Sequence, residues 1–267
     1  MAGGKGYMRE TYQDTMTICR WCGYPDLFIT FTCNPKWPEI TRFVQKSNLR
    51  PEDRPDILTR LFKLKLEELM RDLKERHLFG RTRAVVYTIE FQKRGLPHAH
   101  ILLFLHREDK FPEAADVDRI ISAEIPDPTE SPALYEAVKN SMIQGSCGDL
   151  NPDCPCMIDG KCSKKFPKKF NERTTIDGDG YHVYKRRENG PTIEKDGKTI
   201  HNGYVVPYNV DLLLKYRAHI NVEWCNQARS IKYLFKYINK GYDRVTVSAT
   251  RSNNGSQDPN QIDQIQQ

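Results

Sequence analysis

Two strand-like segments, separated by only five residues, constrain the fold of this chain most strongly. Residues 83–92 carry apolar side chains at every second position, and Thr88, Glu90 and Gln92 share the other face. After a linker that contains a Gly and a Pro, residues 98–105 continue as an apolar run. Successive side chains of a strand point to opposite faces, and a linker this short joins antiparallel neighbours. The sequence therefore predicts a β-hairpin.

The second strand of this hairpin begins with two histidines, His98 and His100, which are separated by one alanine. Residues two apart on a strand face the same way, so both imidazoles are expected on one face. Neutral imidazole is a common ligand for Mn²⁺, Zn²⁺ and Fe²⁺. A carboxylate or amide from Glu90 or Gln92 would complete a half-open metal site with room for a phosphate oxygen. The alternative is a pair of ordinary half-buried histidines.

The remaining pattern predicts a mixed α+β protein with a central antiparallel sheet flanked by helices. Residues 27–33 alternate and predict another strand, and residues 205–225 also have a strand-like pattern. Helices are predicted at residues 8–24, 51–79, 131–142 and 226–240. For the helix over 51–79, which Gly80 closes, the expected apolar stripe is Ile57, Leu61, Leu64, Leu69 and Leu73.

Composition limits the classes of protein to consider. The net charge of +6 suits a polyanionic partner such as nucleic acid. No apolar run approaches the roughly 18 residues that span a membrane, and no signal peptide is evident. Eight cysteines are too few for a disulfide scaffold in a chain of 267 residues, so they are expected to be thiols or metal ligands in the cytosol or nucleus.

A tyrosine pair marks the predicted helix over 226–240. Tyr233 and Tyr237 lie four residues apart, so they share one helix face, which is turned away from the apolar stripe. They are either ordinary exposed tyrosines or a pair of nucleophiles. A phenol with a pKa near 10 is a weak nucleophile at neutral pH, and a cation such as Lys236 or a metal-activated phosphate would compensate.

Several of these segments resemble a known family. Residues 28–32, 96–103 and 233–237 resemble the three motifs of the HUH (His-hydrophobic-His) endonucleases. The wider sequence is similar to the Rep nuclease domain of Helitron rolling-circle transposases, in residues 23–40, 151–157, 162–168 and 205–209. The similarity extends from about Tyr12 to Asp243.

The resemblance implies nicking and strand transfer on single-stranded DNA through a 5′-phosphotyrosine intermediate. Tyr233 and Tyr237 would be the nucleophiles, assisted by Lys236, and two tyrosines suit two successive transfers. His98 and His100 would hold Mg²⁺ or Mn²⁺, which polarises the scissile phosphate. The resemblance favours Gln92 as the third metal ligand, with Glu90 as the alternative or as a partner of a ligand histidine.

The resemblance also implies partners and a location. Single-stranded DNA at transposon ends would be the substrate, and a helicase domain is expected in a longer parent chain. The nucleus is the expected compartment. The alternatives are a replication-initiator nickase of a plasmid or virus, a DNA-binding module whose nuclease has decayed, and a hydrolytic metalloenzyme unrelated to DNA, which would leave the tyrosine pair unexplained.

The expected nuclease domain covers residues 1–247, with a Cys-rich insertion at 142–204 and a polar flexible tail at 248–267. In the insertion, Cys147, Cys154, Cys156 and Cys162 either hold a structural Zn²⁺ or remain free thiols, and Cys154 and Cys156 would point apart in an extended chain. Basic and aromatic side chains that are candidates for DNA contact are Lys36, Trp37, Lys93, Arg94, Lys164 and Lys165.

Overall fold

The computed structural model describes residues 17, 20–45, 48–91, 96–111, 113–145, 147, 151–177, 182–195, 197–225 and 246–249. The chain divides into two compact units. The first comprises residues 1–110 and 224–267, and the second comprises residues 111–223. None of the described helices is long and apolar enough to cross a membrane.

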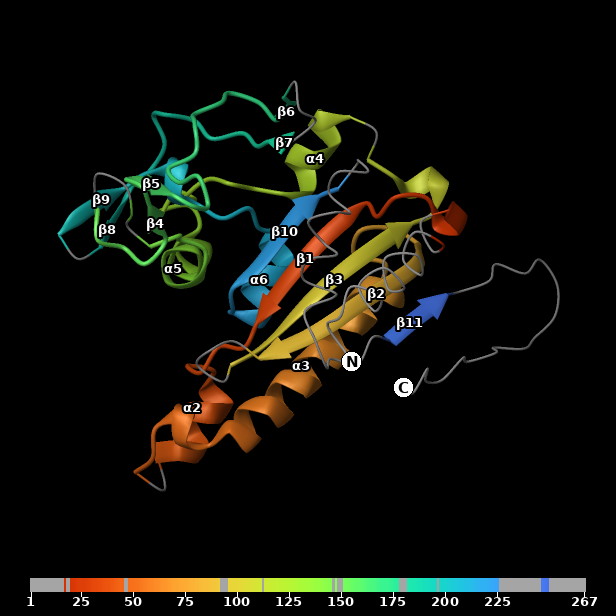
Figure 1. The fold of residues 1–267 in the computed structure, drawn as a ribbon, viewed down its shortest axis with the longest axis horizontal. Helices are drawn as coiled ribbons and strands as arrows, with labels where there is room; N and C mark the ends of the chain where they lie inside the picture. The colour runs from red at the N-terminus through yellow and green to blue at the C-terminus, as the bar shows by residue number, and fades with distance from the viewer. Residues whose placement is uncertain are drawn as a thin grey trace. The chain divides into compact units, whose positions relative to one another are not determined.

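The first unit is built on an antiparallel sheet (Figure 1). The strand order of this sheet is β10-β1-β3-β2-β11, and in β10 the chain passes from the second unit to the first, because residues 220–223 belong to the second unit and Trp224 to the first. The predicted hairpin is β2 and β3, and β3 lies between β1 and β2. The strands are β1 (Leu27–Thr32), β2 (Thr82–Phe91), β3 (Pro97–Leu105), β10 (Ile220–Trp224) and β11 (Thr246–Ala249). The predicted α+β class with a central antiparallel sheet is confirmed.

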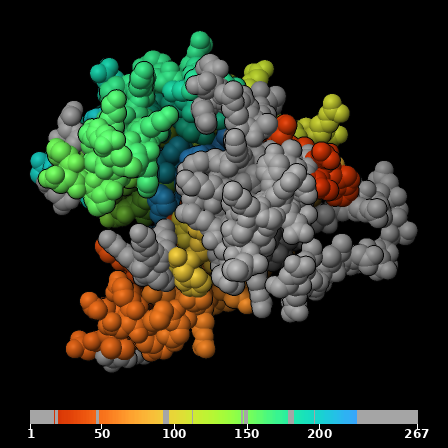
Figure 2. Space-filling model, in the orientation of Figure 1, coloured from red at the N-terminus to blue at the C-terminus, as the bar shows by residue number. Residues whose placement is uncertain are grey.

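One face of this sheet packs on α3 (Pro55–Lys74), while α2 (Pro38–Gln45) lies beside that helix (Figure 1). The Phe31 ring of β1 stacks on the Phe62 ring of α3, with 5.2 Å between the centroids. The predicted strand is confirmed as β1, in which Leu27, Ile29 and Phe31 are fully buried and Phe28 and Thr30 on the opposite face are buried as well. The outer surface of α2 and α3 is the orange region of Figure 2.

The predicted helix over 51–79 is shorter than expected. Pro51–Asp53 is a separate 3₁₀ turn, and α3 ends at Lys74, where the N–H of Glu75 bonds to the Arg71 carbonyl. Gly80, with φ of +108°, belongs to the turn into β2 instead of capping the helix. The buried stripe is also different, because Leu64 is 62 % exposed. Its apolar members are Leu58, Phe62, Leu66, Leu69 and Leu73. Neighbouring members are three or four residues apart, as expected for one face of a helix.

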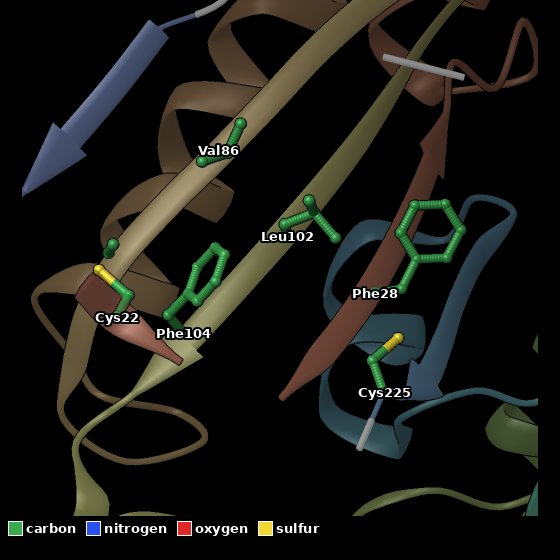
Figure 3. Close-up of a cluster of buried hydrophobic side chains, with 7 residues drawn as sticks. Cys22, Phe28, Val86, Leu102, Phe104 and Cys225 are labelled. Carbon is green, nitrogen blue, oxygen red and sulfur yellow. The ribbon is translucent and has the colours of Figure 1, made fainter. Parts of the chain in front are cut away.

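The other face of the sheet carries an apolar cluster near one end (Figure 3). Phe28 of β1 and Leu102 of β3 are paired across the sheet, as are Leu102 and Val86 of β2. Figure 3 shows these side chains on the same face as Phe104, Cys22 and Cys225. This cluster anchors the sheet at the end away from the β2–β3 turn, so the two halves of this face differ in polarity.

The second unit contains short elements. Its helices are α4 (Ala114–Ile120), α5 (Pro132–Ser141) and α6 (Val210–Tyr216), with a 3₁₀ turn at Asn202–Tyr204. Three two-stranded hairpins follow one another: β4 (Met157–Ile158) with β5 (Lys161–Cys162), β6 (Thr175–Ile176) with β7 (His182–Val183), and β8 (Ile193–Lys195) with β9 (Lys198–Ile200).

Part of the strand-like pattern at 205–225 is helical instead. The side-chain carbonyl of Asn209 accepts the N–H of Leu212 and caps α6. Leu212, Leu213 and Tyr216 are buried at helical spacing. A short apolar run such as residues 212–214 does not distinguish the two-residue period of a strand from the 3.6-residue period of a helix, so this part of the pattern was interpreted as strand-like.

Ser248 and Ala249 belong to β11 and pair with Val85 and Ala84 of β2. The predicted helix over 226–240 lies outside the described residues, as does most of the predicted helix over 8–24. Whether residues 1–247 form one domain with an insertion at 142–204 stays a prediction.

Candidate active site

Two rows of polar side chains cross the sheet on the same face as the apolar cluster. In the first row, His98 on β3 lies directly opposite Thr32 on β1 and Glu90 on β2. Directly paired residues of neighbouring strands share a face, so these three side chains are adjacent. The Thr32 hydroxyl oxygen is 2.6 Å from Nδ1 of His98. One nitrogen of this imidazole is therefore held by β1.

The second row repeats this arrangement two residues further along β3. His100 lies opposite Thr30 on β1 and Thr88 on β2. The Thr30 hydroxyl oxygen is 3.3 Å from Nδ1 of His100, and the imidazole stacks on the Phe28 ring at 5.5 Å and 6°. The hydroxyl of Thr88, which is 1 % exposed, has no hydrogen-bond partner within the part of the chain that the structure describes. A buried polar atom of this kind favours a polar occupant beside it.

The two rows are in contact with each other. The imidazoles of His98 and His100 meet edge to face, with 4.5 Å between the ring centroids. Oε2 of Glu90 is 4.0 Å from Nε2 of His100, which is too long for a hydrogen bond. Both histidines are more than nine-tenths buried. The result is a compact group of imidazole, carboxylate and hydroxyl groups in a largely apolar sheet.

The hydroxyl contacts distinguish the two nitrogens of each imidazole, because Nδ1 is the nitrogen that lies near the threonine oxygen. In the tautomer whose Nδ1–H donates to the threonine oxygen, Nε2 keeps its lone pair. Metal-binding histidines usually have the other ring nitrogen held in this way, which fixes the ring orientation. Two imidazoles with orienting partners and a carboxylate close to one of them fit a divalent cation. The residues present are therefore suited to the metal that the sequence predicts.

The local sequence explains this geometry. Thr30 and Thr32 interrupt an otherwise apolar strand at alternate positions, and Thr88 and Glu90 do the same on β2. Because the side-chain period of a strand is two residues, both pairs fall on the face that carries the histidines. The threonines were not identified from the sequence as partners of the histidines. Thr30 and Thr32 are two residues apart, as the two histidines are, and this spacing was the signal in the sequence that could have identified them as partners.

The structure does not test the whole predicted site. Glu90 is adjacent to the histidines as predicted. The other predicted metal ligand, the predicted nucleophiles with their lysine and two candidates for DNA contact lie outside the described residues: Gln92, Tyr233, Tyr237, Lys236, Lys93 and Arg94. Their roles stay predictions.

Trp37 is not available for DNA contact. Its ring is 1 % exposed, lies 6.1 Å from the Phe31 ring and has the Lys65 ammonium over it at 5.0 Å. The burial of this ring contradicts the prediction that Trp37 contacts DNA, because the core of the first unit covers it. Its neighbour Lys36 is exposed.

The second unit holds a group of thiols. The sulfur atoms of Cys147, Cys156 and Cys162 all lie within 4.8 Å of one another, and Cys154 Sγ is 3.4 Å from Cys156 Sγ. This cluster could hold a metal ion such as Zn²⁺. Burial raises the pKa of the Cys147 thiol to about 12. Burial opposes ionisation of Cys162 too, but hydrogen bonds from backbone N–H groups lower the pKa of that thiol.

Two further predicted DNA contacts, Lys164 and Lys165, immediately follow this thiol group, and both are exposed. Their neighbour Lys168 places its ammonium 4.8 Å from the Phe166 ring centroid. Phe170 is partly exposed and lies 5.0 Å from the His201 ring. Cations and aromatic rings are therefore interleaved here, as the sequence suggests, and contact with DNA stays a prediction.

Part of the chain matches a known protein family. Residues 1–103 match the family model described as "Helitron helicase-like domain at N-terminus". The matched part ends within β3 and includes both histidines, Glu90 and the threonines of β1 and β2. No curated protein matches the chain. The N-terminal part of the chain is thus similar to a Helitron domain, which associates it with transposons.

Proposed function

We propose that this chain nicks and rejoins single-stranded DNA through a 5′-phosphotyrosine intermediate during rolling-circle transposition. The observation that carries this proposal is the pair of polar rows centred on His98 and His100. Three adjacent strands contribute imidazole, hydroxyl and carboxylate groups to one face, within the segment that matches the Helitron model. Burial of polar groups costs stability unless they are hydrogen-bonded or paired, so a cluster of them in an apolar sheet is typical of a functional site.

His98 and His100 would hold Mg²⁺ or Mn²⁺ through their Nε2 atoms, and Gln92 would be the third protein ligand. When bound, the metal would polarise the scissile phosphate and offset the charge that develops on it. Thr30 and Thr32 would hold the orientation of the two imidazoles through contacts with their Nδ1 atoms. Glu90, near Nε2 of His100, would favour the binding of a cation at this place.

The phenol oxygen of Tyr233 or Tyr237 would attack the phosphorus of the scissile phosphodiester. The new bond joins the tyrosine oxygen to phosphorus, and the bond from phosphorus to the 3′ oxygen breaks. The phenol proton is transferred as the leaving 3′ oxygen becomes a hydroxyl, and the ammonium of Lys236 would stabilise the developing phenolate. The products are a 5′-phosphotyrosine and a free 3′-OH.

The phosphotyrosine conserves the energy of the broken phosphodiester bond, because one ester replaces another. A 3′-OH from another strand can therefore attack the same phosphorus and release the tyrosine. Two tyrosines would permit two such transfers, one for each transposon end. Strand separation would come from a helicase domain in a longer parent chain.

The substrate would be held along exposed basic side chains. Lys36 of the first unit and Lys164 and Lys165 of the second unit are exposed, and Lys93 and Arg94 would border the His pair. Such side chains bind the phosphate backbone independently of base sequence. A transposon protein of a nucleated cell would act in the nucleus, where its DNA lies.

The direct test uses single-stranded oligonucleotides labelled at the 5′ or the 3′ end, with Mn²⁺ or Mg²⁺. We expect a covalent protein–DNA product that carries only the DNA on the 3′ side of the nick. Tyr233→Phe combined with Tyr237→Phe should abolish this product, and His98→Ala should reduce its rate by at least 100-fold. Tyr135→Phe, which removes a hydroxyl of the second unit bonded to the Thr192 carbonyl, is the matched control and should have no effect.

Other outcomes would contradict the proposal in distinct ways. Cleavage that persists in the double tyrosine variant, with a free 5′-phosphate as product, would indicate hydrolysis by water. Binding of the oligonucleotide without any cleavage by the unaltered chain would indicate a DNA-binding module. Cleavage only of a double-stranded origin, without transfer to a second strand, would favour a replication initiator.

A further inference from the structure

We infer that Cys147, Cys154, Cys156 and Cys162 form one tetrahedral zinc site that stabilises the second unit. The site is separate from the His pair, and its existence does not depend on the proposed nicking activity. Three of the sulfur atoms already lie within 4.8 Å of one another. Two of these three side chains, Cys147 and Cys162, are buried.

The distances between the sulfur atoms match those of a zinc centre. With Zn–S bonds of about 2.3 Å, the edge of a tetrahedron of four sulfur atoms is about 3.8 Å. The Cys156–Cys162 distance is 3.7 Å, and the Cys154–Cys156 distance is 3.4 Å. Cys156 therefore contacts a sulfur atom on each side at nearly the tetrahedral spacing. Cys154 lies outside the group of three sulfur atoms that are within 4.8 Å of one another, so it must move closer to Cys147 or Cys162 to complete the set.

The backbone around the thiols brings distant residues together. Cys162 ends the β4–β5 hairpin, whose turn at Asp159 and Gly160 has φ of +50° and +72°. The N–H of Ser163 donates to the Cys156 carbonyl at 2.8 Å, and the N–H of Met157 donates to the Cys154 carbonyl at 2.8 Å. Cys154 and Cys156 thus lie in successive turns, so the extended-chain argument that they point apart does not apply.

Cys147 reaches the cluster from an earlier segment. Its carbonyl accepts the hydroxyl of Tyr204, and its sulfur lies 4.0 Å from the Phe166 carbonyl oxygen. Tyr204 and Cys147 are both buried, so this segment is fixed independently of the hairpin. A single ion would link the two segments, which no described strand pairing joins.

The second unit has a physical reason to need such a link. The strands of its hairpins are two or three residues long, and Ile158 and Ile176 are exposed. An isolated two-stranded hairpin is marginal in water without a covering core. Small modules that lack apolar burial commonly use a structural metal, whose binding energy becomes folding energy.

The neighbouring charges suit a zinc–tetrathiolate group, which carries a net charge of −2 after the four thiols lose their protons. Lys164, Lys165 and Lys168 follow Cys162 directly in the chain. The side chain of Lys168 is close enough to Cys162 for the two groups to interact electrostatically.

The test measures metal in the full chain, purified without chelators or added zinc. We expect one zinc per chain by elemental mass spectrometry, released by a thiol-reactive mercurial as the four cysteines react. The Co²⁺-substituted chain should show the visible absorption of tetrahedral cobalt and a sulfur-to-cobalt charge-transfer band. Both measurements use the unaltered sequence, so they do not depend on whether a variant folds.

Substitutions then assign the ligands. Cys147→Ser, Cys156→Ser and Cys162→Ser should each weaken zinc affinity at least 10-fold. Cys154→Ser should retain cobalt with about a quarter of the charge-transfer intensity lost, since one of four thiolates is removed. Cys22→Ala, in the apolar cluster of the first unit, is the matched control and should keep the full spectrum.

Four results would contradict the inference. One is purified chain with no zinc that also gives no tetrahedral spectrum when titrated with Co²⁺. Another is a disulfide between any two of the four cysteines, detected by mass spectrometry of the unreduced chain. The third is a full metal content in the combined Cys147→Ser and Cys162→Ser variant, which would place the ion elsewhere. An unchanged charge-transfer band in Cys154→Ser would remove Cys154 from the ligand set.

Discussion

Thr32 and His98 face each other across the β1–β3 ladder, and the threonine hydroxyl is 2.6 Å from Nδ1 of the imidazole. The two residues are 66 positions apart in the chain. In the tautomer whose Nδ1–H donates to the threonine oxygen, Nε2 keeps its lone pair. In the proposed metal site this contact would orient the imidazole as a ligand, and its removal can be tested.

Thr32→Val replaces the hydroxyl by a methyl group of similar size. We expect Mn²⁺ affinity to fall about 10- to 100-fold, because the imidazole loses the partner that holds its orientation and tautomer. Isothermal titration calorimetry measures this affinity directly. Thr32→Ser keeps the hydroxyl and should bind nearly as well as the unaltered chain. Equal affinity in Thr32→Val would show that this hydroxyl does not position the ligand.

The third metal ligand can be assigned by comparing two variants on β2 and its continuation. If Gln92 binds the metal, Gln92→Ala should weaken Mn²⁺ affinity by at least 10-fold, and Glu90→Gln should have a smaller effect. The reason is that removal of a direct ligand costs more than removal of a charge 4.0 Å from a ligand histidine. Metal titrations of both variants provide the test. The reverse order of effects would make Glu90 the ligand.

Arg186 is expected to be essential for the stability of the second unit. Its buried guanidinium donates to the carbonyl oxygens of Ala123, Asn202 and Val205, at 3.0, 3.0 and 2.7 Å. Arg186→Met leaves these three carbonyls without their donor, and we expect the free energy of unfolding to fall by about 3 to 5 kcal/mol. Urea unfolding followed by circular dichroism measures the loss.

The control for this prediction is Arg173→Met in the same unit. Arg173 is exposed, so its substitution should change the free energy of unfolding by less than about 0.5 kcal/mol. Arg186→Lys keeps the charge but loses the forked donor geometry, and it should remain clearly destabilised. A stable Arg186→Met variant would mean that the three carbonyls find other donors.

Glu124 should make the second unit sensitive to acid. Burial opposes its ionisation, but the side-chain and backbone donors of Arg187 outweigh this and lower the pKa of the Glu124 carboxyl below its usual 4.5. A lowered folded-state pKa means that the stabilisation is complete above pH 4.5 and is lost as the pH falls through the folded-state value. Glu124→Gln should be less stable at pH 7 and should lose less stability on acidification.

Unfolding curves of Glu124→Gln and the unaltered chain between pH 7 and pH 3 give the comparison. The difference between their free energies of unfolding should shrink as the pH falls below 4.5. A difference that stays constant over this range would show that the Glu124 carboxyl contributes no pH-dependent stability.

Sequence alone determined the parts of this protein that depend on local periodicity. The alternation of β1 and β2, the short turn to β3 and the common face of His98 and His100 follow from the two-residue period of a strand. The α+β class follows from the order of strand-like and helix-like patterns along the chain. The same reasoning failed at α6, where a short leucine run fits both periods until a capping residue and the buried neighbours are known.

Only the tertiary structure decided which distant residues meet. The pairing register of β1 with β3 placed Thr30 and Thr32 against the imidazoles, and no local pattern fixes a register between separate strands. The same holds for the burial of Trp37 and for the approach of Cys147 to Cys156 and Cys162. Local periodicity sets the direction of a side chain, whereas its neighbours depend on how segments far apart in the sequence pack together.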